Sequence, residues 1–296
     1  MRILNFGSLN LDHVYTVDHF VTPGETTGAL GYTIYFGGKG HNQSIALARA
    51  GADVWHAGRI GADGESIYSH MKENGVKVDY TTPSQKATGH AIIQVDKNGQ
   101  NAIIVYPGAN GDIDAAYAGE VLQNFGRGDT MLVQNEISNL PCVIKKAKER
   151  GMRIILNPSP ITPAILECPL EFVDVFVVNE VEGEALSGEK DGEKMIAALT
   201  RQYPHAEILL TLGKNGAIFA SGGQRTFQPI YDSPVVDTTA AGDTFTGYFI
   251  TWYLGGKTAA EALSAATMAS AIAVSRPGAA ASIPTKAEVL EKLQQL

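Results

Sequence analysis

The chain has 296 residues, of which 44% are hydrophobic and 18% are charged, so it can bury the core of a sizeable folded protein. Its formal net charge of −8 argues against a broad basic surface, which excludes extended binding to nucleic acid or to an anionic membrane. Any phosphate site in this sequence therefore has to be local.

The metal-binding and targeting signals are weak. Only Cys142 and Cys168 are present, and neither belongs to a CxxC or CxxH pair, so we predict neither a disulfide framework nor a structural zinc site. The seven histidines show no HxxxH or HExxH spacing. The first residues lack a basic region followed by a long apolar stretch, so we predict no signal peptide and a cytoplasmic location.

Apolar strand-like runs alternate with helical patterns along most of the chain, which predicts an α/β fold with a mainly parallel central sheet and helices on both faces. The predicted strands include residues 2–7, 53–58, 130–134, 153–157, 175–178 and 207–212. The predicted helices include residues 41–51, 141–151, 193–203 and 259–274. Because no long linker or repeat divides the chain, we expect a single domain over residues 1–296.

Two segments, residues 13–36 and 89–106, alternate apolar and polar side chains with no helical pattern between them. The DKNG sequence at residues 96–99 predicts a hairpin turn through its Asn98-Gly99 pair. We expect these segments to form a small antiparallel sheet that projects from the α/β body. Since such a sheet has an apolar face to cover, it could serve as a lid over a ligand or as a dimer contact.

The stretch DTTAAGDTFTG, residues 237–247, predicts a strand end, a tight turn and the first turn of a helix. That first turn offers unpaired amides with a partial positive charge, and the small residues Ala240, Ala241 and Gly242 would let a phosphoryl group reach them. Asp243 could instead be a simple helix cap, which is the usual role of an isolated acid at this position.

A second small-residue loop, FGGKGHNQ at residues 36–43, leads polar side chains into another predicted helix. It is not a dinucleotide fingerprint, because position 43 lacks the third glycine. A P-loop is also missing, because residue 251 is Thr where that motif requires Gly. A nicotinamide oxidoreductase is therefore disfavoured, and phosphate chemistry here has to use another geometry.

Several motifs in a fixed order give the chain a family resemblance. DTTAAGD and FGGKGHNQ, with GSLNLDH (7–13), PGET (23–26), VVNEVEGE (177–184) and TLGKNG (211–216), resemble the ribokinase-like carbohydrate kinases over essentially the whole chain. The resemblance implies the fold of that family with a small β lid. It also implies ATP with Mg²⁺, a monovalent cation such as K⁺, and a homodimer formed through the lid.

The resemblance assigns roles position by position. It implies that Asp243 is the general base for the primary hydroxyl of the sugar, and that the amides of Ala240, Ala241 and Gly242 form an anion hole. The implied sugar-binding residues are Asn10, Asp12, Gly38, Lys39, Asn42, Glu136 and Asp243. The implied residues for Mg²⁺ and nucleotide are Asn179, Glu182, Thr211, Leu212, Gly213, Lys214, Asn215, Gly216 and Gly242. The implied monovalent-cation positions are Asp237, Thr239, Ala273, Arg276, Gly278 and Ser282.

These residue types suit the implied chemistry on physical grounds. Phosphoryl transfer needs in-line placement and cancellation of charge more than covalent help, and carboxylates and amides can each hold sugar hydroxyls. Plainer interpretations stay open at several positions. Asn42 could cap a helix, Asp12 or Glu136 could be solvated loop acids, and Asp237 could cap its own turn. We expect His41 to face solvent rather than to act in catalysis.

The function that the resemblance implies is an ATP-dependent kinase acting on the primary hydroxyl of a pentose, with D-ribose as the first choice. Deoxyribose, a ketohexose or a nucleoside stay open, because one or two side chains decide among them. The competing class is a sugar or nucleotide sensor without turnover. Such a sensor should have lost Asp243 or Gly242, and both are present.

Overall fold

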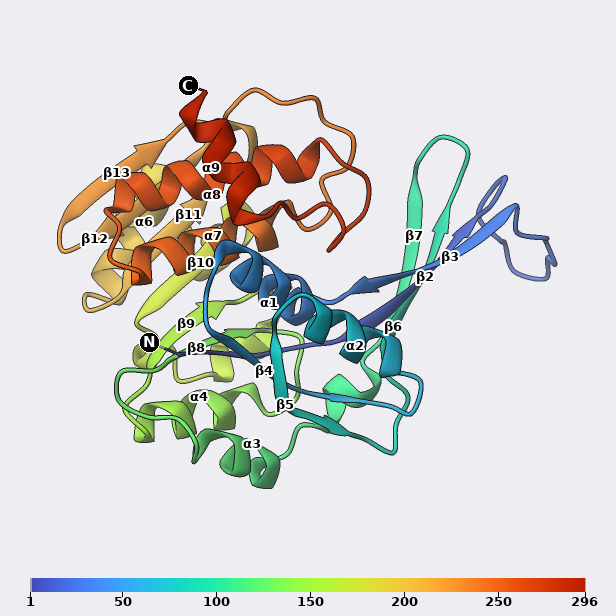
Figure 1. Cartoon of the computed structure of the whole chain (residues 1–296), viewed down its shortest axis with the longest axis horizontal. Coiled ribbons are helices and arrows are strands. Elements are labelled where there is room, and N and C mark those ends of the chain that lie inside the picture. The colour runs from blue at the N-terminus through green and yellow to red at the C-terminus, as the bar shows by residue number, and fades with distance from the viewer. Residues whose placement is uncertain (1, 296) are drawn as a thin grey trace.

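A nine-stranded sheet forms the centre of the computed structural model, which describes residues 2–295 (Figure 1). Its strand order is β13-β12-β11-β10-β9-β8-β1-β4-β5, and all neighbours from β5 to β11 pair in parallel, whereas β12 and β13 are antiparallel. The strands are β1 (Ile3–Phe6), β4 (Val54–Ile60), β5 (Lys77–Pro83), β8 (Thr130–Gln134), β9 (Arg153–Asn157), β10 (Val175–Asn179), β11 (Glu207–Thr211), β12 (Ala217–Ser221) and β13 (Gln224–Gln228).

Helices cover both faces of this sheet, as the sequence predicts. One face carries α3, α4, α5 and α6, and the other carries α1, α2, α7, α8 and α9. The helices are α1 (Lys39–Ala50), α2 (Glu65–Glu73), α3 (Ala115–Leu122), α4 (Leu140–Glu149), α5 (Glu180–Ser187), α6 (Gly192–Gln202), α7 (Ala241–Leu254), α8 (Ala259–Val274) and α9 (Lys286–Gln294). Short 3-10 turns occur at η1 (Gly108–Asp112), η2 (Pro163–Glu167), η3 (Leu170–Phe172) and η4 (Gly213–Asn215).

The central strands are apolar on both sides because each of their faces lies under helices. In β1, Ile3 belongs to the core on the α1 side, whereas Leu4 and Phe6 belong to the core on the α3 side. The predicted strands and helices are confirmed, with ends that move by up to two residues. Strands β5, β12 and β13 were not among the predicted strands; of these, the two edge strands β5 and β13 are partly polar. No helix within residues 2–295 is long and apolar enough to cross a membrane.

A separate four-stranded sheet projects from the body and is called the lid below (Figure 1). Its order is β3-β2-β6-β7, and both of its hairpins are antiparallel, as predicted. The middle pair, β2 with β6, is parallel, because both strands leave the body at their first residues, where Asn10 pairs with Gly89. The lid strands are β2 (Asn10–Thr16), β3 (Gly31–Gly37), β6 (Gly89–Val95) and β7 (Asn101–Tyr106).

The hairpin turn between β6 and β7 is present at the predicted place. Gly99 alone takes a left-handed conformation, at φ 76°, whereas the Asn98-Gly99 pair predicts this for both residues. The carboxylate of Asp96 explains the difference, because it accepts the amides of Asn98 and Gln100 at 2.8 and 2.9 Å. These bonds hold Asn98 outside the left-handed region.

Candidate active site

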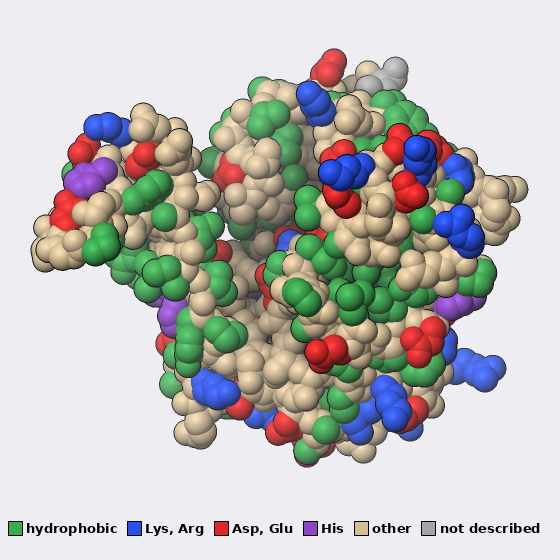
Figure 2. Space-filling view, turned by 180° about the vertical axis from the view of Figure 1, so that it is seen from behind, with side chains coloured by type: hydrophobic (Ala, Val, Ile, Leu, Met, Phe, Trp, Pro, Cys, Tyr) green, Lys and Arg blue, Asp and Glu red, His purple; other side chains and the backbone are tan. Residues whose placement is uncertain are grey.

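A hollow lies between the lid and the body, and charged side chains are visible inside it (Figure 2). The segments that carry the predicted site follow the carboxyl ends of β1, β8, β10 and β11. In an open parallel sheet, this end is where ligands bind. The lid and the first turns of α1 and α7 complete the site.

The start of α1 packs tightly against the segment that follows β1. A Cβ atom on Gly40 would lie 2.3 Å from the amide nitrogen of Ser8 and 2.5 Å from the carbonyl carbon of Gly7, so only glycine fits. Gly38 has a φ of 88°, which also favours glycine. The two backbones can therefore approach closely enough to share one carboxylate.

That carboxylate belongs to Glu136, which follows β8. Its Oε2 accepts the main-chain amide of Lys39 at 2.8 Å and the hydroxyl of Ser8, whose Oγ in turn accepts the amide of Gly40 at 3.2 Å. Burial raises the pKa of Glu136 above its ordinary value, although these hydrogen bonds oppose the shift. The alternative that Glu136 is a solvated loop acid is therefore wrong.

Asp12 points into the same region from β2. Burial, together with the nearby carboxylate of Glu136, raises the pKa of Asp12 to about 6. A Cβ atom on Gly37 would lie 2.0 Å from Oδ2 of Asp12, so this glycine makes room for the carboxylate. The alternative that Asp12 is a solvated loop acid is also wrong.

Lys39 balances these acids. Burial lowers the pKa of Lys39, but the carboxylates of Asp243, Glu136 and Glu182 raise it, and the net pKa lies above the ordinary value. The ammonium group therefore stays charged among carboxylates that come from three different parts of the chain.

Asp243 is held by two side-chain amides from α1. Asn42 Nδ2 donates to Oδ2 at 3.0 Å, and Gln43 Nε2 donates to Oδ1 at 2.9 Å. Only 7% of Asp243 is exposed, and it makes no capping bond to α7, whose N-cap is Ala240. Asn42 does not cap α1 either, because the N-cap there is Gly38. Both helix-cap alternatives are therefore wrong.

The first turn of α7 leaves main-chain donors free beside this carboxylate. The amide of Ala241 is bonded to the carbonyl of Thr238 at 3.2 Å, whereas those of Gly242 and Asp243 have no acceptor among residues 2–295. A Cβ atom on Gly242 would find nothing within 4 Å. Ala240 starts the turn at a φ of 59°, a conformation that costs energy for any residue except glycine. Of the predicted anion hole, the amides of Ala240 and Gly242 are therefore open within residues 2–295, and the amide of Asp243 is open beside them.

A cavity of about 610 Å³ adjoins these amides, a size typical of sites for small molecules. Of the predicted nucleotide residues, those that line it are Asn179, Thr211, Gly213, Lys214, Gly216 and Gly242. Glu182, Leu212 and Asn215 are not part of this lining. Sequence reasoning missed the apolar and hydroxyl-bearing side of the cavity, which has no motif; it includes Val181, Ile230, Tyr231, Val235, Phe245, Thr267 and Val274.

Asn179 and Glu182 form a capping box at the start of α5. Asn179 Oδ1 accepts the amide of Glu182 at 3.0 Å, and the carboxylate of Glu182 accepts the amide of Asn179 at 2.9 Å. Among residues 2–295, no group of three or more His, Cys, Asp or Glu side chains is placed to hold a metal ion. This donor set suits Mg²⁺ that keeps waters and phosphate ligands rather than an all-protein metal site.

Asp237 ties together the two loops that carry the predicted cation positions. Its Oδ1 accepts the amide of Thr239 at 2.9 Å, and its Oδ2 accepts the amide of Gly278 at 3.0 Å. Burial raises the pKa of Asp237, but these bonds lower it, and the net pKa lies below the usual range. Asp237 does cap its own turn, as the alternative held, and it also bridges to the second loop. In that loop the side chains of Arg276 and Ser282 bond to Glu288 and to the carbonyl of Ala279, and Ala273 closes the adjoining end of α8.

His41 does not face solvent, so that prediction is wrong. The side chain is fully buried beneath the lid strand β3, against Phe36 and His70. Its Nε2 lies 3.1 Å from Nδ1 of His70, and its Nδ1 lies 3.3 Å from Oδ1 of Asn42. Burial and the neighbouring His70 lower the pKa of His41 to about 3, so the imidazole is neutral.

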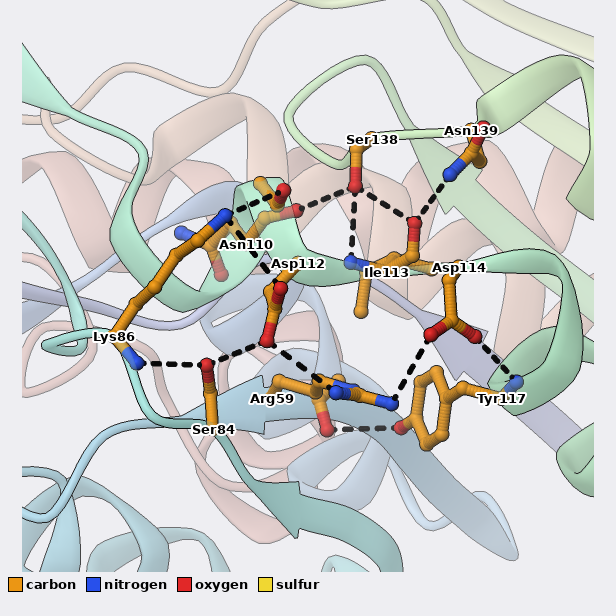
Figure 3. Close-up of polar contacts among 12 residues, drawn as sticks. Arg59, Ser84, Lys86, Asn110, Asp112, Ile113, Asp114, Tyr117, Ser138 and Asn139 are labelled. Carbon is orange, nitrogen blue, oxygen red and sulfur yellow. Dashed lines mark hydrogen bonds and ion pairs between the residues drawn. The ribbon is translucent and has the colours of Figure 1, made fainter.

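The root of the lid is fixed by polar contacts around η1 (Figure 3). Asp112 accepts the Ser84 hydroxyl at 2.7 Å and the Arg59 guanidinium at 3.3 Å, and it lies 3.5 Å from the Lys86 ammonium. Two residues earlier, Asn110 donates to Oδ1 of Asn10 at 2.8 Å. Sequence reasoning missed Asn110, which connects the root of the lid to a predicted sugar residue.

Comparison with known proteins identifies the family. The family model described as pfkB family carbohydrate kinase matches residues 2–286. The chain is 35% identical to the ribokinase of Haemophilus influenzae, over 97% of both chains, and 35% identical to that of Bacillus subtilis, over 99% of both. The structure of Arabidopsis thaliana ribokinase complexed with ribose and ATP is similar, with a TM-score of 0.87, 31% identity and coverage of 99% of this chain and 98% of the other. The chain belongs to the pfkB family of carbohydrate kinases.

Proposed function

We propose that this chain is an ATP-dependent ribokinase, which transfers the γ-phosphoryl group to the primary 5-hydroxyl of D-ribose. The observation that carries the proposal is the buried carboxylate of Asp243 beside the free amides of Gly242 and Asp243. The relatives named ribokinase, and the similar structure that holds ribose and ATP, support the choice of substrates.

In the proposed reaction, the hydroxyl oxygen of ribose attacks the γ-phosphorus while the bond to the bridging oxygen of ADP breaks. The proton of the hydroxyl passes to the carboxylate of Asp243, and ADP leaves. The free amides at the start of α7 donate to the phosphoryl oxygens as their charge develops. The helix end thus neutralises charge without a side chain in the path.

For the sugar, the carboxylates of Asp12 and Glu136 would accept hydroxyl protons, and the amides of Asn10 and Asn42 would complete the contacts. Lys39, held positive by the surrounding acids, would donate toward the sugar and the transferred group. The main chain at Gly38 would let the ring approach closely. These assignments follow the family positions and the convergence of the side chains in the hollow.

For the nucleotide, the cavity beside Gly242 offers an apolar side for a base and the η4 loop for phosphates. Mg²⁺ bound with ATP would neutralise phosphate charge, and Asn179 and Glu182 are the residues we assign to ordering it. The loops joined by Asp237 would hold a monovalent cation, K⁺ by preference, largely through main-chain carbonyls. Removing the divalent ion with a chelator should abolish turnover, and replacing K⁺ by a large organic cation should lower it.

We also propose a homodimer formed through the lid, and a cytoplasmic location. Lid side chains such as Tyr32 and Ile104 are 52% and 67% exposed in the single chain, and the strand register places them on one uncovered apolar face with Ile34, Ile92 and Tyr106. Light scattering at micromolar concentration should give twice the mass of one chain, and in Ile104→Lys the measured mass should fall to that of one chain. A strict monomer for the unaltered chain would rule out the dimer.

A panel of D-ribose, deoxyribose, ketohexoses and nucleosides in an ADP-release assay tests the substrate. The proposal expects the highest kcat/KM on D-ribose. Preference for deoxyribose, a ketohexose or a nucleoside would keep the kinase and replace the substrate. Thermal stabilisation by sugar and ATP without ADP release would instead favour a sensor.

A further inference from the structure

Gln43 touches the catalytic carboxylate from a place that no ligand reaches. Its side chain is fully buried, whereas Asn42, the other donor to Asp243, is 6% exposed. Gln43 Nε2 donates to Oδ1 of Asp243 and to Oδ1 of Asn157, each at 2.9 Å. Its contacts are therefore with the reacting carboxylate and with the sheet beneath, not with the sugar.

A chain of buried side-chain amides holds Gln43 from below. Gln134 Nε2 donates to Oε1 of Gln43 at 2.6 Å and to Oδ1 of Asn5 at 2.9 Å. Asn5 Nδ2 donates in turn to the carbonyl of Gly40 at 2.6 Å. On the other side, Asn157 Nδ2 donates to the carbonyl of Val177 at 2.9 Å.

Both ends of this network are main-chain carbonyls, which can only accept hydrogen bonds. They fix which way the amides of Asn5 and Asn157 face, and each amide then fixes the next. As a result, Gln43 has to turn its NH₂ group, rather than its oxygen, toward Asp243. The orientation does not depend on Asp243 itself.

The network also contains one unpaired buried acceptor, which lowers the stability of the fold. Oε1 of Gln134 is buried without a hydrogen-bond partner among residues 2–295. Gly7 lies against this atom, since a Cβ atom there would be 2.4 Å away. A buried unpaired acceptor destabilises the folded state, and such a break in local packing rules is characteristic of functional sites.

We propose that Gln43 is a positioning residue for Asp243, and that Gln134 fixes the orientation in which Gln43 acts. This inference rests on the proposed kinase function and goes beyond it, because neither residue contacts substrate. The network holds the carboxylate in one orientation beside the free amides of α7. A nearly fixed base costs no reorganisation when the phosphoryl group arrives.

The first experiment replaces Gln43 by methionine, which keeps the length of the side chain and removes the donor. For Gln43→Met we expect kcat on ribose to fall about 10- to 100-fold, as for a slightly misplaced reacting group. The KM for ribose should change by less than about threefold, since the sugar contacts remain. Gln123→Met, the same change at the exposed end of α3, should alter neither constant. An unchanged kcat for Gln43→Met would overturn the proposal.

Two further variants separate positioning from a purely structural role. In an Asp243→Asn background, Gln43→Met should lower the residual rate no further, because the base it holds is gone. A second full loss in that background would contradict the inference. Gln134→Met removes one unpaired acceptor but leaves Oε1 of Gln43 and Oδ1 of Asn5 without a donor, so the melting temperature should fall, and kcat should fall with it. A lower melting temperature with unchanged kcat would indicate a structural role only.

The proposed function and this inference can fail separately. If the unaltered chain releases no ADP on any sugar, the kinase assignment fails, and crystal structures then decide about Gln43. In Gln43→Met, the carboxylate of Asp243 should rotate or occupy several conformers while α1 and α7 stay in place. A carboxylate that keeps its single orientation would overturn the inference whatever the enzyme does.

Discussion

Two helix N-termini meet in the site, and they use their free amides in opposite ways. At the start of α1, the amides of Lys39 and Gly40 already donate to Glu136 and Ser8, and the backbone is packed against its neighbour. At the start of α7, the amides of Gly242 and Asp243 have no acceptor within residues 2–295, and the space around Gly242 is open.

The difference shows that one helix N-terminus stabilises the structure of the site, whereas the other stays available to a ligand. Both helices present the positive end of a dipole, but α1 uses it to fix an acidic side chain of the protein. At α7 the same end stays free, and we propose that it binds an anion that arrives from outside. The glycines in the two loops look alike in the sequence, yet Gly40 serves packing, whereas Gly242 faces open space in which we propose that a ligand binds.

The largest expected effect concerns the carboxylate that joins the two helix ends. Asp243→Asn should lower kcat about 10²- to 10⁴-fold, the usual loss on removal of a general base. The melting temperature should fall only moderately, because Asn keeps one oxygen for Asn42 or Gln43 and only one of these two amides loses its acceptor. Steady-state rates and thermal unfolding measure the two quantities. Asp191→Asn, the same change at the N-cap of α6, should leave both unaltered, since Asn caps as well as Asp. Full activity in Asp243→Asn would refute its role.

The two glycines test the comparison directly. Gly40→Ala should destabilise the fold by about 1–3 kcal/mol, because its new methyl group would meet fixed backbone. Gly242→Ala should leave stability within about 0.5 kcal/mol, since the methyl group points into open space. In Gly242→Ala, the methyl group would instead keep the phosphoryl group away from the free amides of α7. It should lower kcat about 10²- to 10³-fold, as for a lost anion-hole donor. Denaturant unfolding measures the loss of stability in each variant, and initial rates measure kcat. If the two variants lost the same stability and the same kcat, the proposed difference between the two helix N-termini would be wrong.

The acidic pair on the α1 side predicts a pH dependence for sugar binding. With the pKa of Asp12 raised to about 6, the residue is protonated in the free protein below that pH. If the carboxylate binds ribose, the KM should rise about tenfold between pH 7 and pH 5. Asp12→Asn should bind weakly with no such pH dependence. A KM that stays flat for the unaltered chain would remove Asp12 from the sugar site.

The raised pKa of Asp12 also makes the stability of the fold depend on pH. The pKa of Asp12 is raised on folding from 3.8 to about 6, so its contribution is fully present below pH 3.8 and is lost as pH rises through 6. Asp12→Asn should therefore raise the free energy of unfolding at pH 8 but not at pH 3.5. Urea unfolding at both pH values gives the comparison, and stabilisation only at the lower pH would contradict it.

The smallest expected effect concerns the strained turn before α7. Ala240→Gly should stabilise the fold by about 0.5–1 kcal/mol, because glycine adopts the left-handed conformation without strain. Ala241→Gly, one residue later inside the helix, should destabilise it by a similar amount. Melting temperatures that move in the same direction for both variants would show that strain at Ala240 is negligible.

Much of the fold and part of the candidate site could be predicted from the sequence, because local patterns indicate the strands, the helices and the small-residue loops. Helix α8 matches its prediction at both ends, since a run of small apolar residues between clear caps defines it. The loops around Gly40 and Gly242 stood out for the same reason, although their different uses did not.

The rest depends on contacts between residues far apart in the chain. Gln43 and Asp243 are separated by 200 residues, and Asn10 and Asn110 by 100, so no local pattern indicates either bond. His41 was misjudged because the cover of β3 and α2 over that face of α1 is a tertiary feature. The apolar side of the proposed nucleotide cavity is lined by residue types that are common in protein cores, so the sequence alone does not indicate it.

A crystal structure of the chain with D-ribose and a non-hydrolysable ATP analogue tests the central claim most directly. We predict a γ-phosphate oxygen about 2.7–3.1 Å from the amide nitrogen of Gly242 or Asp243. The primary hydroxyl of ribose should lie about 2.6–3.2 Å from the carboxylate of Asp243. A terminal phosphate bound away from the first turn of α7, or a sugar hydroxyl out of reach of Asp243, would contradict the account.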